Sequence, residues 1–197
     1  MSESLFNQMF PKRNMFYTYQ GLVQATKLYP GFASEGTLDV RKREAAAFLA
    51  NMARETGELV YIEQIAKGPY CQDSAKYPCA PGQQYYGRGP IQISWNYNYG
   101  AAGDALGVNL LADPGLVGRD AKIAWETGLW FWSTSKPGGE TCHTAMTKSL
   151  GFGATVNIIN GAVECNGGNP SSVQDRVDHY QTYCGLLGVS PGGNLSC

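Results

Sequence analysis

Two glutamates lie close together where a helix-forming stretch of the chain gives way to a loop rich in glycine and proline. Glu55 is near the end of a helix predicted over residues 37–56, and Glu63 follows in the loop. Phe48, Met52 and Glu55 recur at helical spacing, so their side chains share one face. That face is apolar, so we expect the Glu55 carboxyl to point toward a core or a cleft, where desolvation raises its pKa. A carboxyl that stays protonated near neutral pH can donate a proton.

Glu63 supplies a second carboxyl for the same chemistry. The β-branched and aromatic residues 59–62 predict that the chain leaves the helix before Glu63. In a continued helix Glu63 would lie about 12 Å along the axis from Glu55, and a turn would bring it closer. Two carboxyls about 6.5–9.5 Å apart leave room for one water, which is the arrangement of an inverting glycosidase. The spacing alone equally fits an ordinary ion pair of Glu55 with Arg41 or Arg54.

Composition restricts the class of partner. The chain has 197 residues with a formal net charge of −1, which argues against nucleic acid or an anionic membrane as a partner. Twelve tyrosines and four tryptophans suit a neutral, ring-stacking ligand such as a sugar, although core packing must explain most of them. We find neither an apolar stretch long enough to span a membrane nor a signal peptide at the start of the sequence.

The six cysteines point to disulfides rather than to a metal. The sequence has no Cys-x-x-Cys motif and only two histidines, so no zinc site is expected. An even number of cysteines fits disulfides in an oxidising compartment. Cys71 and Cys79 bracket a short loop, which favours a bond between them.

Helical patterns dominate the chain and strands are few, so the fold class is mainly α. Thr37 and Asp120 are expected to cap the helices at 37–56 and 120–132, and the last long helix is expected to begin after a cap at Ser171 and to end at Gly188. Loops are predicted at 66–90 and 136–140. The other predicted helices cover residues 3–9, 17–28, 37–56, 95–107, 120–132, 144–150 and 153–159.

The segment from Pro78 to Gly100 favours the catalytic interpretation of the two glutamates over an ordinary ion pair. It reads PCAPGQQYYGRGPIQISWNYNYG and strongly resembles the signature of glycoside hydrolase family 19 chitinases. The resemblance covers residues 16–197 and looks like that of a compact, bacterial-type member. Further matching blocks lie at 105–111, 129–132, 157–161, 174–177 and 188–197.

The resemblance implies one catalytic domain over residues 1–197, with a two-lobed, lysozyme-like fold and a long cleft. The implied activity is endo-hydrolysis of the β-1,4 linkages of chitin, the N-acetylglucosamine polymer, by an inverting two-carboxylate mechanism. The implied partners are chitin or chitooligosaccharides, with no metal or organic cofactor. We expect a secreted, extracellular monomer.

The resemblance also assigns catalytic roles. Glu55 matches the general acid, although Arg54 stands where the family usually has histidine. The general base matches Glu63, but the register is open because Gln64 or Glu58 could take its place. Ser94 matches a serine that holds the attacking water; capping a helix before Trp95 is the alternative.

Other residues match supporting positions. Substrate contacts are implied for Gln92, Asn98 and Asn160, because amide side chains can both donate to and accept from a sugar. Tyr97 and Tyr86 are candidates to line the cleft, with core packing as the alternative. Glu164 and Arg176 match a charged network behind the acid. Disulfides are implied for Cys71–Cys79 and Cys165–Cys197, which leaves Cys142 and Cys184 as a third pair.

Two other functions are compatible with the same residues. A lysozyme-like endolysin that cleaves peptidoglycan would use a similar cleft and acid. A chitin-binding, lectin-like protein that has lost catalysis would result if no carboxylate occupied the position of the base.

Overall fold

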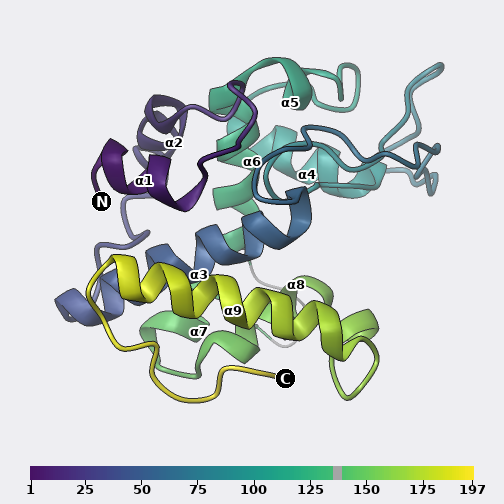
Figure 1. Cartoon of the computed structure of the whole chain (residues 1–197). Coiled ribbons are helices and arrows are strands. Elements are labelled where there is room, and N and C mark those ends of the chain that lie inside the picture. The colour runs from purple at the N-terminus through teal and green to yellow at the C-terminus, as the bar shows by residue number, and fades with distance from the viewer. Residues whose placement is uncertain (135–138) are drawn as a thin grey trace. The chain divides into compact units, whose positions relative to one another are not determined.

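The computed structural model describes residues 1–134 and 139–197, and in this part of the chain helices dominate (Figure 1). β structure there is limited to two isolated antiparallel bridges, Glu63 with Arg88 and Arg88 with Ile93. The prediction of a mainly α fold is therefore confirmed. The loop predicted at 136–140 lies largely outside the described residues. None of the helices in the described ranges is long and apolar enough to cross a bilayer.

The helices of the described residues follow the predicted order, except that the short helix α5 was not predicted. They are α1 (Glu3–Met9), α2 (Tyr19–Thr26), α3 (Leu38–Thr56), α4 (Asn96–Leu106), α5 (Leu116–Arg119), α6 (Ala121–Ser133), α7 (Cys142–Thr147), α8 (Phe152–Glu164) and α9 (Pro170–Leu186).

Polar caps set several of these boundaries. The Thr37 hydroxyl accepts a hydrogen bond from the amide of Val40 at the start of α3. At the start of α6, the Asp120 carboxylate accepts hydrogen bonds from the amides of Lys122 and Ile123. Caps of this kind satisfy amides that lack a partner within the helix. Both caps were predicted from the sequence.

The predicted boundaries were wrong in the C-terminal third. Helix α9 is capped by the Asn169 side chain, which accepts from the amide of Ser172, and Pro170 is its first residue, so Ser171 is not the cap. Helix α7 begins two residues before the predicted Thr144. Helix α8 continues to Glu164 because the helix resumes after a kink at Asn160 (φ −146°, ψ 30°).

The chain forms two compact units. The first contains residues 1–11, 29–54 and 132–197, and the second contains residues 12–28 and 55–131. Helix α3 passes from the first into the second after Arg54, and α6 passes back after Phe131.

The first unit packs helices around an aromatic core. Helix α9 lies against α1 and α8, and α8 lies against α7. The Phe152 ring of α8 stacks on the Tyr180 ring of α9, with the ring centres 4.3 Å apart. Phe48 of α3 meets Trp132 edge to face at 5.5 Å. Trp132 is fully buried.

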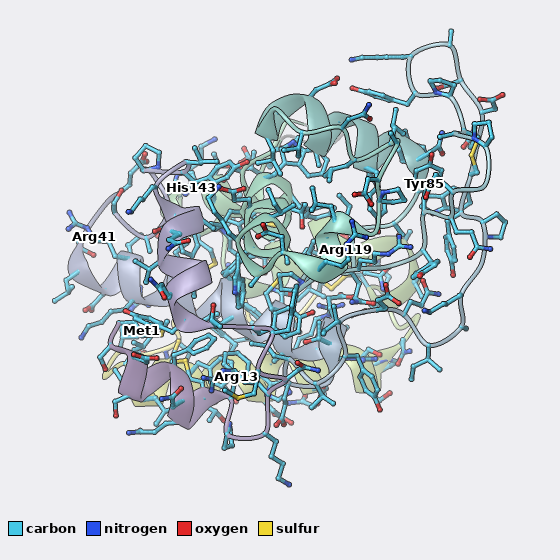
Figure 2. All side chains as sticks on the ribbon, turned by 90° about the horizontal axis from the view of Figure 1, so that it is seen from above. Met1, Arg13, Arg41, Tyr85, Arg119 and His143 are labelled. Carbon is cyan, nitrogen blue, oxygen red and sulfur yellow. A yellow bond between two sulfur atoms is a disulfide. The ribbon has the colours of Figure 1, made fainter. Side chains whose placement is uncertain are left out.

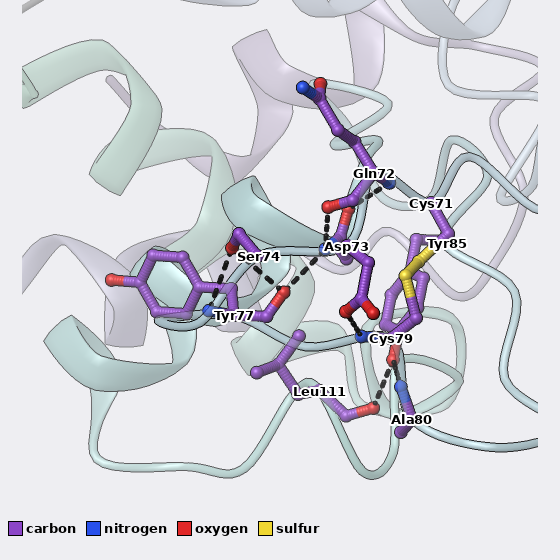
Figure 3. Close-up of a disulfide and its surroundings, with 10 residues drawn as sticks. Cys71, Gln72, Asp73, Ser74, Tyr77, Cys79, Ala80, Tyr85 and Leu111 are labelled. Atoms are coloured by element: carbon purple, nitrogen blue, oxygen red, sulfur yellow. Dashed lines mark hydrogen bonds between the residues drawn. A yellow bond between two sulfur atoms is a disulfide. The ribbon is translucent and has the colours of Figure 1, made fainter.

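The second unit organises its long loop around Tyr85, which is fully buried and labelled in Figure 2. The Tyr85 hydroxyl accepts from the amide of Ala80 and donates to the carbonyl of Leu111 (Figure 3). The Cys71–Cys79 disulfide closes the same loop (Figure 3). Fixed by these bonds, the loop presents a defined backbone for the residues that follow it.

The structure corrects one cysteine pairing. Disulfides join Cys71 to Cys79 and Cys165 to Cys197, as the resemblance implied. The third predicted pair was wrong: Cys142 and Cys184 are buried thiols with no bond between them. Burial raises the pKa of the Cys184 thiol to about 11, and a protonated, buried thiol packs as a small apolar group.

Candidate active site

Glu55 lies in the last turn of α3 and its side chain is half-buried. Phe48 and Met52, which share its helical face, are fully buried. The predicted apolar face is therefore present, and Glu55 stands at its border with solvent. A carboxyl at this border keeps access to a ligand while part of its surroundings stays apolar.

The chain reverses sharply after Glu55. Three consecutive residues, Gly57, Glu58 and Leu59, have positive φ angles of 57°, 62° and 63°. Buried Thr56 holds the turn, because its hydroxyl accepts from the amide of Leu59. Left-handed conformations are unfavourable for residues other than glycine, and such strain gathers at functional sites. The predicted exit from the helix is confirmed.

Glu63 is surrounded by cations and a phenol. The Arg88 Nε lies 3.3 Å from Oε1, and the Lys67 Nζ lies 2.6 Å from Oε2. The Tyr86 hydroxyl donates to Oε2 at 3.3 Å. Gly118 of α5 borders the same carboxylate, since a Cβ at this position would lie 3.2 Å from Oε1.

These neighbours control the charge of Glu63. Partial burial by itself favours the protonated form, but the hydrogen bond and charge of Lys67, with Arg88 and Tyr86, outweigh it and hold the pKa of Glu63 below its usual 4.5. Glu63 therefore stays a carboxylate in mildly acidic solution, which is the state that a general base requires.

Arg88 is the fixed member of this group. Its side chain is 5% exposed, and Nη1 donates to the carbonyl of Gln84 and the hydroxyl of Tyr99, both at 3.0 Å. The guanidinium carbon lies 3.7 Å from the centre of the Tyr86 ring. Sequence reasoning did not select Arg88, although a lone charge between two glycines of the Gly87-Arg88-Gly89 motif was a usable signal.

Gln64 has a different role from its neighbour. Its side-chain Oε1 accepts a hydrogen bond from the backbone amide of Gly87 at 3.0 Å, and its backbone amide donates to the Gly87 carbonyl at 2.8 Å. Its Nε2 donates to the hydroxyl of Tyr70. Gln64 thus joins two loop segments, whereas Glu58 is exposed on the turn after α3. Of the three positions considered for the base, Glu63 has the surrounding cations.

Ser94 and its neighbours lie in a second strained segment. Gln92 and Trp95 have positive φ angles of 51° and 74°. Trp95 occupies the N-cap position of α4 and makes no side-chain cap. The alternative interpretation of Ser94 as the cap of this helix was therefore wrong, and the structure leaves its role as a prediction.

The predicted substrate-binding amides are partly engaged within the protein. The Nε2 of Gln92 donates to the carbonyls of Ile62 and Gly89, at 3.2 and 2.9 Å. The Nδ2 of Asn98 donates to the carbonyl of Ser94 at 2.9 Å. Both side chains are half-buried. Their amide oxygens are therefore the atoms best suited to accept a hydrogen bond from a ligand.

Tyr97 is 39% exposed and stacks on Trp95, which is 37% exposed, with ring centres 6.0 Å apart and planes within 13°. Tyr86, in contrast, is buried. The exposure of Trp95 was not predicted, because the residues around it show no hydrophobic periodicity that would indicate an exposed side chain.

Glu164 and Arg176 form a buried ion pair in the first unit. Arg176 Nη2 and Nε donate to the two oxygens of Glu164, each at 2.8 Å, and both side chains are less than 5% exposed. Arg176 Nη1 also donates to Asn51 Oδ1 of α3 at 3.0 Å. Asn160, at the kink of α8, donates to Glu164 at 2.8 Å. The predicted pairing is present, together with Asn51, which sequence reasoning missed.

Charge balance keeps Glu164 ionised in this network. Burial raises the pKa of its carboxyl, but the hydrogen bonds of Arg176 and Asn160 and the charges of Arg176 and Arg54 hold the pKa below its usual value. Arg54 itself donates from Nη2 to the hydroxyl of Ser172 at 2.6 Å and lies 3.5 Å from Asp175 of α9. Arg54, which stands where a histidine was expected, thus contacts α9.

Replacement of Arg176 by methionine should lower the free energy of unfolding by about 3–5 kcal/mol, because it leaves the buried Glu164 carboxylate unpaired. Urea unfolding at neutral pH measures this. Arg119→Met is the matched control, since the Arg119–Asp113 pair is 61% and 51% exposed and should change stability by less than about 1 kcal/mol. Equal effects of the two substitutions would contradict the assignment of Glu164–Arg176 as a stabilising buried ion pair.

The free energy of unfolding of the wild-type protein should fall in acid as the pH drops through the lowered pKa of Glu164.

Comparisons with known proteins show the family of the chain. The family model of class I chitinases of the glycoside hydrolase 19 group matches residues 1–197. Endochitinase 3 of Solanum tuberosum is 43% identical over 232 residues, covering 100% of this chain and 73% of the relative. Chitinase C of Streptomyces griseus superimposes with a TM-score of 0.95 at 55% identity, covering 100% of this chain and 96% of that structure. The class IV chitinase of Zea mays superimposes with a TM-score of 0.91 at 47% identity, covering 100% of this chain and 97% of that structure.

The chain belongs to the class I chitinase family of glycoside hydrolases. The resemblance inferred from residues 78–100 is thereby confirmed, and so is the class of enzyme. Chitin or chitooligosaccharides are the substrates that this family implies.

Proposed function

We propose that the protein is a secreted, monomeric endochitinase in which Glu55 and Glu63 hydrolyse the β-1,4 bond with inversion. The observation that carries the proposal is the environment of Glu63: a carboxylate kept ionised by Arg88 and Lys67, on the loop that follows the helix of Glu55. A partly buried acid and a stabilised base are the pair that inverting hydrolysis needs.

Glu55 acts as the general acid. It donates its proton to the glycosidic oxygen as the bond to C1 breaks, so the departing sugar leaves as a neutral alcohol. Glu63 accepts a proton from a water on the opposite face of the sugar ring, and the oxygen of this water bonds to C1. Each turnover moves one proton from Glu63 back to Glu55 through solvent, which restores both groups.

Ser94 holds the attacking water in this scheme. Its segment is held in strained conformations at Gln92 and Trp95, which supports a role beyond local folding. Gln92 also bonds to the carbonyl of Ile62, so the segment that carries Ser94 is tied to the residue before Glu63. This link favours a common task for Ser94 and Glu63.

The substrate is held by amides and rings. Gln92, Asn98 and Asn160 have side-chain oxygens that can accept from sugar hydroxyls and N-acetyl N–H groups. The exposed ring of Tyr97, stacked on Trp95, offers an apolar face for a pyranose ring. Glu164 and Arg176, both less than 5% exposed, support α3 through Asn51.

Secretion is supported by the two disulfides, Cys71–Cys79 and Cys165–Cys197, because such bonds persist in oxidising compartments. A monomer suffices because all of the residues assigned here belong to one chain.

Incubation with colloidal chitin and, separately, with purified bacterial cell walls tests the proposed substrate. We expect reducing ends to appear from chitin and not from the walls, and soluble products to include oligomers from the first minutes, as endo-cleavage requires. Release from walls alone would indicate a peptidoglycan hydrolase. Binding to chitin without any release would indicate a lectin.

A further inference from the structure

Two cations of different character hold the carboxylate of Glu63. Arg88 contacts Oε1 and is 5% exposed, whereas Lys67 contacts Oε2 and is 50% exposed. The proposed mechanism explains neither why the base needs two cations nor which of them stays in place during turnover. The surroundings of each cation answer the second question.

Arg88 cannot move without breaking several bonds. Its guanidinium donates to Gln84 and Tyr99 and lies against the Tyr86 ring. Moving it would leave a buried charge without partners, which is costly. The contact of Arg88 with Oε1 of Glu63 therefore stays in place.

Lys67 can withdraw into water. It follows Glu63 by four residues in a loop, where its amide donates to the carbonyl of Ile65 at 3.1 Å. Besides Glu63, its ammonium lies 4.9 Å from the centre of the Tyr86 ring. An exposed lysine in such a pair gains little by staying, because water solvates the ammonium almost as well.

The chemistry of a general base requires an open oxygen. A carboxylate oxygen has two lone pairs, and on Oε2 they meet the Lys67 ammonium at 2.6 Å and the Tyr86 hydroxyl at 3.3 Å, which leaves none for a proton from water. Oε1 is bordered by the buried Arg88 and by Gly118 of α5, so we take Oε2 as the oxygen that accepts the proton. We propose that Lys67 is a positioning residue of the base: it covers Oε2 of Glu63 in the free enzyme and withdraws when the attacking water binds.

This proposal rests on the assignment of Glu63 as the base, and it has a consequence for the pH profile. The charged and titratable groups around Glu63 are Lys67, Arg88, Tyr86 and, one contact further away, Tyr99. Of these, Lys67 contributes the largest lowering of the pKa of Glu63. Without Lys67 the pKa of the base in the free enzyme rises, so the acid limb of the kcat/KM profile moves to higher pH.

Lys67→Met tests the inference, with kcat and KM for the N-acetylglucosamine hexamer measured from acid to mildly alkaline pH. We expect kcat/KM on the acid limb to fall about threefold or more, since less of the base is ionised in the free enzyme there, while kcat on the plateau stays level or rises. Raising the salt concentration should move the wild-type acid limb in the same direction, because salt screens exposed pairs.

Two matched variants complete the experiment. Lys67→Arg keeps a cation and should keep the wild-type acid limb. Lys76→Met removes an exposed lysine that also lies over a tyrosine ring, Tyr77 at 5.0 Å, and it should leave the profile unchanged.

An acid limb that Lys67→Met does not move would overturn the inference, and so would a plateau kcat that falls tenfold, since the lysine would then be needed in the transition state. Either result, in an active wild-type enzyme that Glu63→Gln inactivates, leaves the proposed function intact. A wild-type chain without hydrolysis would instead refute the proposed function.

Discussion

Glu55→Gln should abolish chitin hydrolysis and spare the binding of chitooligosaccharides. Glutamine has nearly the same shape as glutamic acid but cannot donate a proton to the glycosidic oxygen. Loss of a general acid costs about 10²–10⁴-fold in turnover. Single-turnover hydrolysis of the N-acetylglucosamine hexamer measures the loss, and calorimetric titration with the same sugar measures affinity.

Glu58→Gln is the control for this variant, because Glu58 is exposed on the turn that follows α3 and lies only three residues away. We expect its turnover to remain near that of the wild type. Turnover of Glu55→Gln close to the wild-type value would refute the assignment of the acid. Equal loss of affinity and turnover would indicate that Glu55 serves binding instead.

Glu63→Gln should lower kcat by about 10²-fold or more, because the amide cannot accept a proton from the attacking water. KM should change little, since the other groups that bind the sugar remain. The acid limb of the wild-type profile should lie below the pH at which an ordinary glutamate titrates, as the lowered pKa of Glu63 requires. The activity of the wild-type enzyme is therefore retained in mild acid and lost as the pH falls through the lowered pKa of Glu63.

Glu140→Gln is a matched control for Glu63→Gln. Glu140 also pairs with a lysine, Lys148 at 3.0 Å, and hydrogen bonds and charge likewise lower its pKa. It belongs to the first unit, next to α7. Its replacement should leave turnover unchanged. If Glu63→Gln stays active while Glu58→Gln is inactive, the base is Glu58.

Local patterns predicted most of the helices. The spacing of apolar residues placed α3 and its buried face, and the caps at Thr37 and Asp120 were read from side chains that satisfy the first amides of a helix. These features depend on residues that are neighbours in the sequence, so they can be inferred without the fold.

The errors arose where local signals compete. Asn169 and Ser171 are both good caps, and Pro170 decides between them because it fits the first turn of a helix. Counting cysteines favoured a third disulfide, but Cys142 and Cys184 are buried thiols in the folded chain, which only tertiary packing determines.

The candidate site was predictable only in part. The resemblance located Glu55, Glu63 and the Glu164–Arg176 pair, which lie in two separate segments of the chain. It did not provide the contacts that set the charge of Glu63, because Lys67 and Arg88 meet it through the path of a loop. A loop of this kind has no periodicity from which such contacts follow.

The measurement that tests the central claim most directly is time-resolved proton NMR of the hydrolysis of the N-acetylglucosamine hexamer. If Glu55 donates a proton while Glu63 activates a water on the opposite face, the newly formed reducing ends appear first as the α-anomer and equilibrate later by mutarotation. New ends that appear first as the β-anomer would show that configuration is retained, and would contradict a mechanism with Glu63 as the base for water.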